Sequence, residues 1–95
     1  MQNCSGSISF DVNDMYMLLD VYMQNLAIPN IIGKRMFDTY EDAKNEAINQ
    51  AEAEFQNYYQ KMYAGTGYEP EITEIDDSVY ISAPKESEWW TIVEV

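Results

Sequence analysis

Carboxylates are the residues whose number and spacing in this sequence could do chemistry. The 95 residues contain 17 Asp and Glu against five Lys and Arg and no His, which gives a net charge of −12. A carboxylate pair acts as general acid and base only when a cleft holds the two groups close and separates their pKa values. In a chain this acidic, close pairs form by chance, so the pattern predicts a protein that is not an enzyme.

The residues that most other catalytic and cofactor chemistry requires are absent from this sequence. Without His, and with Cys4 as the single cysteine, the sequence excludes Ser–His and Cys–His catalysis, CxxC redox motifs and intramolecular disulfides. The Gly65–Thr66–Gly67 turn lacks the Lys and the glycine spacing of a phosphate loop and follows a predicted helix, so it indicates a helix stop. The acidic segments lack the spacing of an EF-hand. We therefore expect no metal and no cofactor.

The acidic residues form two groups along the chain. Asp38, Asp42 and Glu46 recur every four residues, which places them about 6 Å apart along one face of a helix. Residues 66–95 hold eight acids and one base, net −7, and five of these acids crowd one segment: Glu69, Glu71, Glu74, Asp76 and Asp77. Carboxylates spaced in this way resemble the charge pattern of a nucleic-acid backbone and would attract a basic groove. The alternative is that the row is the solvated face of an amphipathic helix.

Aromatic residues and methionines are more numerous than a small core usually needs. Trp89 and Trp90 are adjacent on a predicted strand and must face opposite sides of it. Tyrosine and tryptophan are common anchors of protein interfaces, and we expect Tyr58, Tyr59 and Trp89 to serve as such anchors. The alternative is a tyrosine-rich core with polar tips at the surface. A patch of Met15, Met17, Met23 and Met36 with one exposed Trp also allows a homodimer.

The hydrophobic pattern predicts one domain over residues 1–95, with residues 1–6 frayed. Ile8, Phe10 and Val12 alternate and predict a strand over residues 7–12, whereas the three- and four-residue spacing in 14–27 predicts a helix. Residues 31–37 fit either a short strand or an ordered loop. A long helix is expected from an Asp38 cap, with Glu41 as its capping-box partner, to about Ala64. Strands are expected over 71–75, 79–82 and 89–95, with turns at 76–78 and 84–87.

Together these elements predict an α+β fold. Two helices, one of them long, would pack on a small antiparallel sheet of three to four strands. The net charge disfavours direct binding to nucleic acid and to anionic membranes. Residues 1–7 show no cationic and apolar signal sequence, and no window approaches 18 apolar residues, so we expect a cytoplasmic protein without a membrane span.

In size, charge and aromatic content the chain resembles the small acidic inhibitors that phages and mobile elements encode, the anti-CRISPR and antirestriction DNA-mimic proteins. Asp38, Asp42 and Glu46, the acidic segment from Glu69 to Asp77 and the surplus of Tyr and Trp carry the resemblance, without a diagnostic motif. The resemblance implies a non-catalytic protein in the cytoplasm of a bacterial host cell. It would occupy the nucleic-acid-binding site of a basic partner, such as a CRISPR effector or a restriction nuclease.

Two other classes share this profile. Immunity proteins and antitoxins that neutralise basic nuclease toxins are also small and acidic, and they use the same pairing of carboxylates with a cationic active site. A structural or accessory subunit that assembles with copies of itself would use the apolar patch instead.

Overall fold

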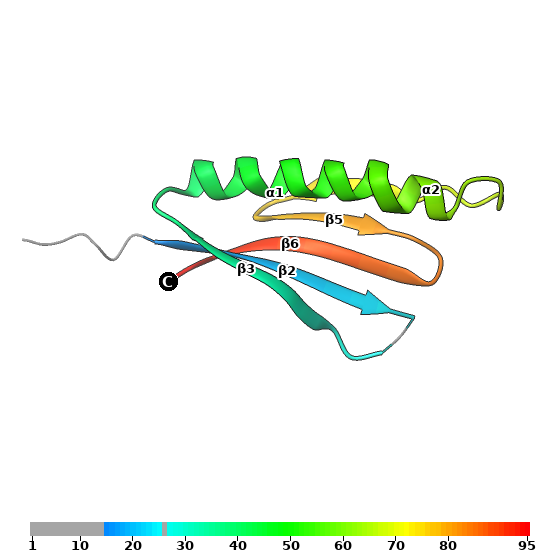
Figure 1. Cartoon of the computed structure of the whole chain (residues 1–95). Coiled ribbons are helices and arrows are strands. Elements are labelled where there is room, and N and C mark those ends of the chain that lie inside the picture. The colour runs from blue at the N-terminus through cyan, green and yellow to red at the C-terminus, as the bar shows by residue number, and fades with distance from the viewer. Residues whose placement is uncertain (1–14, 26) are drawn as a thin grey trace, which may run out of the picture.

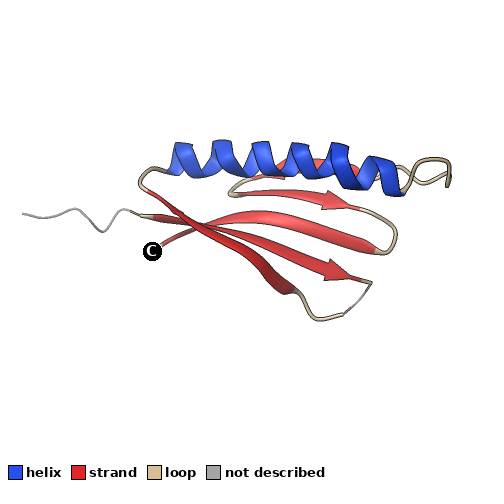
Figure 2. Cartoon of the chain, viewed as in Figure 1, coloured by secondary structure: helices blue, strands red, loops and turns tan. Residues whose placement is uncertain are grey.

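The described chain forms one five-stranded antiparallel sheet with a helix on one face (Figures 1 and 2). The structure, a computed structural model, describes residues 15–25 and 27–95. The strands, in the spatial order β3-β2-β6-β5-β4, are β2 (Tyr16–Gln24), β3 (Asn30–Phe37), β4 (Glu71–Ile75), β5 (Ser78–Ser82) and β6 (Glu86–Glu94). The helix comprises α1 (Tyr40–Glu54), the π-helical turn η2 (Phe55–Tyr59) and α2 (Gln60–Met62). The predicted strand over 7–12 and the frayed residues 1–6 lie outside the described residues.

The predicted fold of two helices on three to four strands is wrong. Over the described residues there is one helix on five strands, because the segment predicted as the first helix contains strand β2. β2 pairs with β3 on one side and with β6 on the other. A strand in this position carries apolar residues on both faces, such as Leu18 toward the helix and Leu19 on the opposite face. Such a segment shows no alternation of polar and apolar residues, so its pattern imitates an apolar helix.

The ambiguous segment after β2 is a strand. β3 forms one edge of the sheet, and its register with β2 shifts between Asp20 and Val21. Gly33 lies opposite Asp20, where an added Cβ atom would come within 3.2 Å of the Asp20 Cβ atom. The glycine therefore provides space for the Asp20 side chain beneath the helix.

The long helix was predicted correctly in extent but not in its cap. Thr39 is the N-cap, and its side chain accepts a hydrogen bond from the Asp42 N–H at 3.1 Å, so the predicted cap by Asp38 with Glu41 is wrong. At the other end, Gly65 adopts a φ of 78° after the last helical turn, as expected of a C-terminal stop. Within the described chain, no helix is long and apolar enough to cross a membrane.

The core lies between the helix and the sheet. Ala43, Ala47 and Ala51 are fully buried on the lower face of α1, and the absence of larger side chains lets the helix lie close to the strands. They pack against a cluster from three strands: Leu18, Val79, Ile81, Trp90 and Ile92. Among the described elements none covers the other face of the sheet (Figure 2).

The last strand begins earlier than predicted. Glu86 and Ser87, expected in a turn, belong to β6, and the Ala83 N–H closes the preceding turn by donating to the Glu86 carbonyl at 3.0 Å. The strands predicted over 71–75 and 79–82 are confirmed as β4 and β5. The early start of β6 turns the side chains of Glu86 and Glu88 toward the helix.

Candidate functional site

One group of predicted acidic residues gathers at the start of the helix. The turn between β4 and β5 lies beside the first helical turns, where the Tyr40 hydroxyl donates to Asp77 at 2.8 Å. The ammonium group of Lys44 lies 3.2 Å from the Glu74 carboxylate and also donates to the backbone carbonyl of Asp76. Because this lysine is mostly buried, the acids around it dominate the exposed surface.

The helical row does not join this group along a single face. The Glu46 carboxylate lies 3.4 Å from Arg35 of β3 and accepts a hydrogen bond from Gln50 at 2.8 Å. Lys44 and Glu46 are two residues apart, or about 200° around a helix, so they point to opposite flanks. Asp38 and Asp42 are exposed at the start of α1. The two predicted acidic groups are therefore separated at Glu46, which lies toward β3, whereas Glu74, Asp76 and Asp77 lie on the β4 side.

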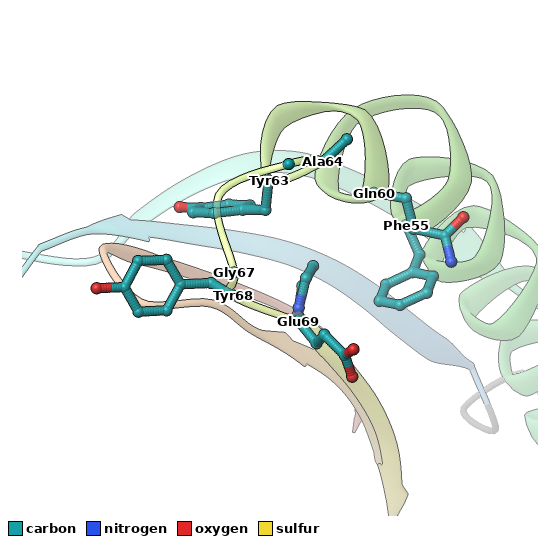
Figure 3. Close-up of a pocket in the computed structure, with 9 residues that line it drawn as sticks. Phe55, Gln60, Tyr63, Ala64, Gly67, Tyr68 and Glu69 are labelled. Carbon is teal, nitrogen blue, oxygen red and sulfur yellow. The ribbon is translucent and has the colours of Figure 1, made fainter.

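The predicted segment from Glu69 to Asp77 is also spread out. Glu71 pairs with Ser82 at the far end of β4, and neighbouring residues of a strand face opposite sides of the sheet, so Glu71 and Glu74 lie on different faces. Glu69 lines a cleft of about 470 Å³ at the C-terminal end of the helix (Figure 3). These carboxylates therefore do not form one surface with those at the helix start.

Two of the predicted aromatic anchors belong to the interior. Tyr59 is fully buried, and its hydroxyl donates to Glu88 at 3.1 Å. Tyr58 is half-buried beside it, with the two rings edge to face at a centroid distance of 4.8 Å. Tyr59 thus has no exposed surface with which to contact a partner. Its position agrees with the alternative prediction of a tyrosine-rich core.

Trp89 and Trp90 face opposite sides of the sheet, as predicted. Trp90 is buried in the core and donates from its indole nitrogen to Gln50 at 3.0 Å. Trp89 is half-buried on the face that carries no helix, opposite Val21 of β2 and Tyr80 of β5. The register adds four more apolar residues to this open face: Met17, Leu19, Met23 and Met36. Three of the four methionines predicted to form an apolar patch therefore share one side of the sheet.

A buried carboxylate that the sequence did not single out organises the C-terminal end of the helix. Glu86 is 8% exposed and accepts hydrogen bonds from three phenols, Tyr22 at 2.6 Å, Tyr58 at 3.0 Å and Tyr63 at 2.8 Å. The hydrogen bond to Glu86 raises the pKa of Tyr22, while burial is the first cause of the raised pKa values of Tyr58 and Tyr63. The three phenols therefore remain hydrogen-bond donors to one carboxylate.

A second buried carboxyl group lies two residues further along β6. Glu88 is 3% exposed, and burial, followed by its interaction with Asp20 on β2, raises its pKa to about 9. Burial also raises the pKa of Asp20, whose Oδ1 atom has no hydrogen-bond partner. Two adjacent buried carboxyl groups cannot both be charged without a large penalty, so the pair holds a proton at neutral pH.

The only sequence signal for these two carboxylates is alternation. Glu86, Glu88, Trp90 and Ile92 occupy every second position, the period of a strand face. The alternation was not recognised at the start of β6, because charged side chains such as Glu86 and Glu88 are rarely buried. Pro84, just before them, also favoured a turn.

Two clefts border the tyrosines at this end of the molecule. The cleft shown in Figure 3 lies beside Phe55, Tyr63 and Tyr68. A second cleft, of about 550 Å³, reaches Glu86 and is lined by Tyr58, Met62, Tyr63 and Tyr68, among other residues. Tyr63 and Tyr68 line both clefts and separate one from the other.

Within residues 15–25 and 27–95, no group of three or more Asp, Glu or Cys is arranged to hold a metal ion. Comparisons with protein families, with curated proteins and with solved structures found no match to this chain.

Proposed function

We propose that this protein is a non-catalytic inhibitor that binds a basic partner and occupies its nucleic-acid-binding site. The expected partner is a CRISPR effector or a restriction nuclease. The observation that carries it is the acidic surface around the start of α1. These carboxylates lie on both flanks of the first helical turns and are together called the helix-start surface: Asp38, Glu41 and Asp42 at the start of α1, and Glu74, Asp76 and Asp77 on the β4 side.

The charge on this surface is largely free to act on a partner. The ion pairs among the described residues are Arg35–Glu46 and Lys44–Glu74, and the second involves a mostly buried lysine. The remaining carboxylates of the helix-start surface face solvent, where they would steer a cationic groove toward the protein over long range. Steering of this kind weakens as salt rises.

The test removes charge from the surface without changing the shape of its side chains. A triple variant, Asp38→Asn, Asp42→Asn and Asp76→Asn, would be compared with the native protein for binding to a panel of purified restriction nucleases, CRISPR effector complexes and nuclease toxins. We expect a panel member to bind the native protein in competition with its DNA or RNA. The triple variant should bind at least tenfold more weakly, with a smaller dependence on salt.

A matched control separates the surface from the total charge. Glu52→Gln, Glu69→Gln and Glu71→Gln remove the same charge from exposed positions outside the helix-start surface. Equal weakening by both triple variants would show that only the net charge matters. Absence of competition with nucleic acid would contradict the proposed mode of inhibition.

A second candidate function, a self-associating subunit, is favoured by the open face of the sheet. Met36 and Val93 are 42% and 41% exposed on this face and Trp89 is half-buried on it, in a chain whose other surfaces are strongly acidic. Contiguous exposed apolar surface of this kind is typical of protein interfaces.

A further inference from the structure

The second cleft at the C-terminal end of the helix has aromatic walls. Its volume of about 550 Å³ lies within the usual range for small-ligand sites. Tyr58 and Tyr63 from the helix side and Tyr68 from the following loop contribute rings, and Met62 contributes a thioether. Aromatic faces are electron-rich and attract cations.

A tight turn links the two outer tyrosines, Tyr63 and Tyr68. Gly65 and Gly67 both have positive φ values, 78° and 89°, which glycine adopts without strain. Between them, the Thr66 hydroxyl donates to the Tyr63 carbonyl at 2.7 Å and accepts from the Tyr68 N–H at 3.2 Å. Figure 3 shows the hydroxyls of Tyr63 and Tyr68 pointing to the same side, away from Phe55 and Gln60. The turn therefore fixes the backbone from which Tyr63 and Tyr68 extend.

The carboxylate at the base of the cleft lacks a cation. Glu86 is more than nine-tenths buried, and its described partners are three neutral phenols. Lys85 also lines the cleft but is exposed and forms no ion pair within the described chain. Phenols that donate to a carboxylate become more electron-rich, which strengthens the attraction of their rings for a positive charge.

The chemistry of the lining favours one kind of cation. A metal ion needs several oxygen ligands, whereas this cleft offers one carboxylate whose neighbouring hydroxyls are occupied as donors to it. A guanidinium group prefers both oxygens of a free carboxylate, and both Glu86 oxygens already accept hydroxyls. An ammonium group needs a single point of contact, and its alkyl stem can lie along the rings and the Met62 side chain.

We propose that the cleft between Tyr58, Tyr68 and Glu86 binds an alkylammonium group. A lysine side chain of a protein partner and a free primary amine carry the same chemistry. The site goes beyond the proposed inhibition, because it lies at the opposite end of the helix from the helix-start surface and stands whether or not that surface binds a nuclease.

The first test measures binding of n-butylammonium by NMR, with n-butanol as a neutral probe of similar shape. We expect the ammonium compound to shift the ring signals of Tyr58, Tyr63 and Tyr68 and the Met62 methyl signal with a millimolar dissociation constant. n-Butanol should bind at least tenfold more weakly. Equal binding of the two compounds would overturn the proposal, because an apolar cleft would then explain it.

Substitutions distinguish the cleft from the rest of the surface. Tyr68 is 60% exposed, so Tyr68→Ala should leave the fold intact and reduce n-butylammonium affinity at least fivefold. Tyr40→Ala makes the same change at the start of the helix and should leave the affinity unchanged. Lys85→Met removes the competing positive charge and should raise the affinity about threefold, a gain that a purely structural role would not produce. Unchanged affinity in both cleft variants would overturn the proposal.

A third arm identifies the source of the ammonium group. Nα-acetyl-lysine methylamide should compete with n-butylammonium and shift the same ring signals if the cleft accepts a lysine side chain. Failure to compete, with n-butylammonium still bound, would assign the cleft to a free amine. This test uses the protein alone, so it can succeed even if no member of the nuclease panel binds. If it fails, the proposed inhibition of a nuclease is not affected.

Discussion

Glu88 carries a carboxyl group that the fold holds protonated at neutral pH. Its pKa rises from an ordinary value of 4.5 to about 9 because it is buried and lies next to Asp20. The folded state therefore keeps a proton that the unfolded chain releases above pH 4.5. The stabilisation from this group is complete below pH 4.5 and is lost as pH rises from there to about 9.

We predict that Glu88→Gln removes this pH dependence. Glutamine keeps the shape of the protonated carboxyl group, including an oxygen that can accept from Tyr59, and has no proton to lose. At pH 8 the variant should be more stable than the native protein by about 2 kcal/mol. This value is smaller than the full pKa shift of Glu88 would give, because Glu88 shares its proton with Asp20. Urea unfolding at pH 5, 6.5 and 8 measures the slope. Glu94→Gln, at an exposed position, should leave the slope unchanged, and a native slope in Glu88→Gln would refute the assignment.

At the scale of the element, the beginning of the helix depends on a single hydroxyl. Thr39 caps α1 by accepting the Asp42 N–H, while Asp38 precedes the cap and makes no such contact. Both residue types are good N-caps, so composition alone did not distinguish them. The choice follows from how the chain leaves β3 and enters the helix.

We predict that Thr39→Ala lowers the free energy of unfolding by about 1 kcal/mol, because a backbone N–H loses its partner. Asp38→Ala should cost no more than about 0.5 kcal/mol, since it removes only a favourable charge near the helix start. Chemical denaturation of the two variants under the same conditions gives the comparison. A larger loss for Asp38→Ala would show that Asp38 is the effective cap in solution.

At the other end of the helix, the π-helical turn η2 accompanies the change from alanines to tyrosines on the sheet side. The Gln60 N–H donates to the Phe55 carbonyl five residues back, which marks the wide turn. Ala43, Ala47 and Ala51 precede this turn in the core, whereas Tyr58 and Tyr59 within it meet the carboxylates of β6. The wide turn thus places phenols over the buried acids.

At the scale of the whole molecule, two surfaces oppose each other in their effect on self-association. The net charge of −12 repels a second copy, while the open face of the sheet presents apolar residues such as Trp89 and Met36. Repulsion between exposed charges is screened by salt, whereas apolar contact is not weakened by it.

We predict that raising NaCl from 20 to 500 mM shifts the protein toward a dimer in analytical ultracentrifugation. Met36→Lys, which places a charge on the open face where Met36 is 42% exposed, should prevent the shift. Met62→Lys makes the same change on the helix, where Met62 is 53% exposed, and should not prevent it. A monomer at every salt concentration would rule out the open face as a dimer surface.

The two proposed binding regions lie at opposite ends of the same helix. Residues 40–62 extend over roughly 33 Å at 1.5 Å per residue. The helix-start surface offers exposed charge, and the tyrosine-lined cleft offers a buried charge with aromatic walls. A partner long enough to contact both regions would place positive charge at two different kinds of site. Binding to the nuclease panel tests the first site, and n-butylammonium binding tests the second.

The local sequence pattern by itself determined several elements of this protein. The long helix follows from apolar spacing and from Gly65 at its end, and β4 and β5 follow from short apolar runs between turn residues. The acidic character and the absence of His-based chemistry are matters of composition. These features depend on neighbours a few residues away, so they can be predicted without the tertiary structure.

Tertiary structure decided the rest. β2 resembles a helix in sequence and becomes a strand because β3 and β6 pair with both of its edges and so provide backbone hydrogen-bond partners along its length. Glu86 resembles a turn residue and becomes the centre of a cluster because Tyr22, 64 residues earlier, and Tyr58 and Tyr63 on the helix satisfy its oxygens. A buried carboxylate is stable only where donors compensate for its lost hydration, and in this chain those donors come from segments that only folding brings together.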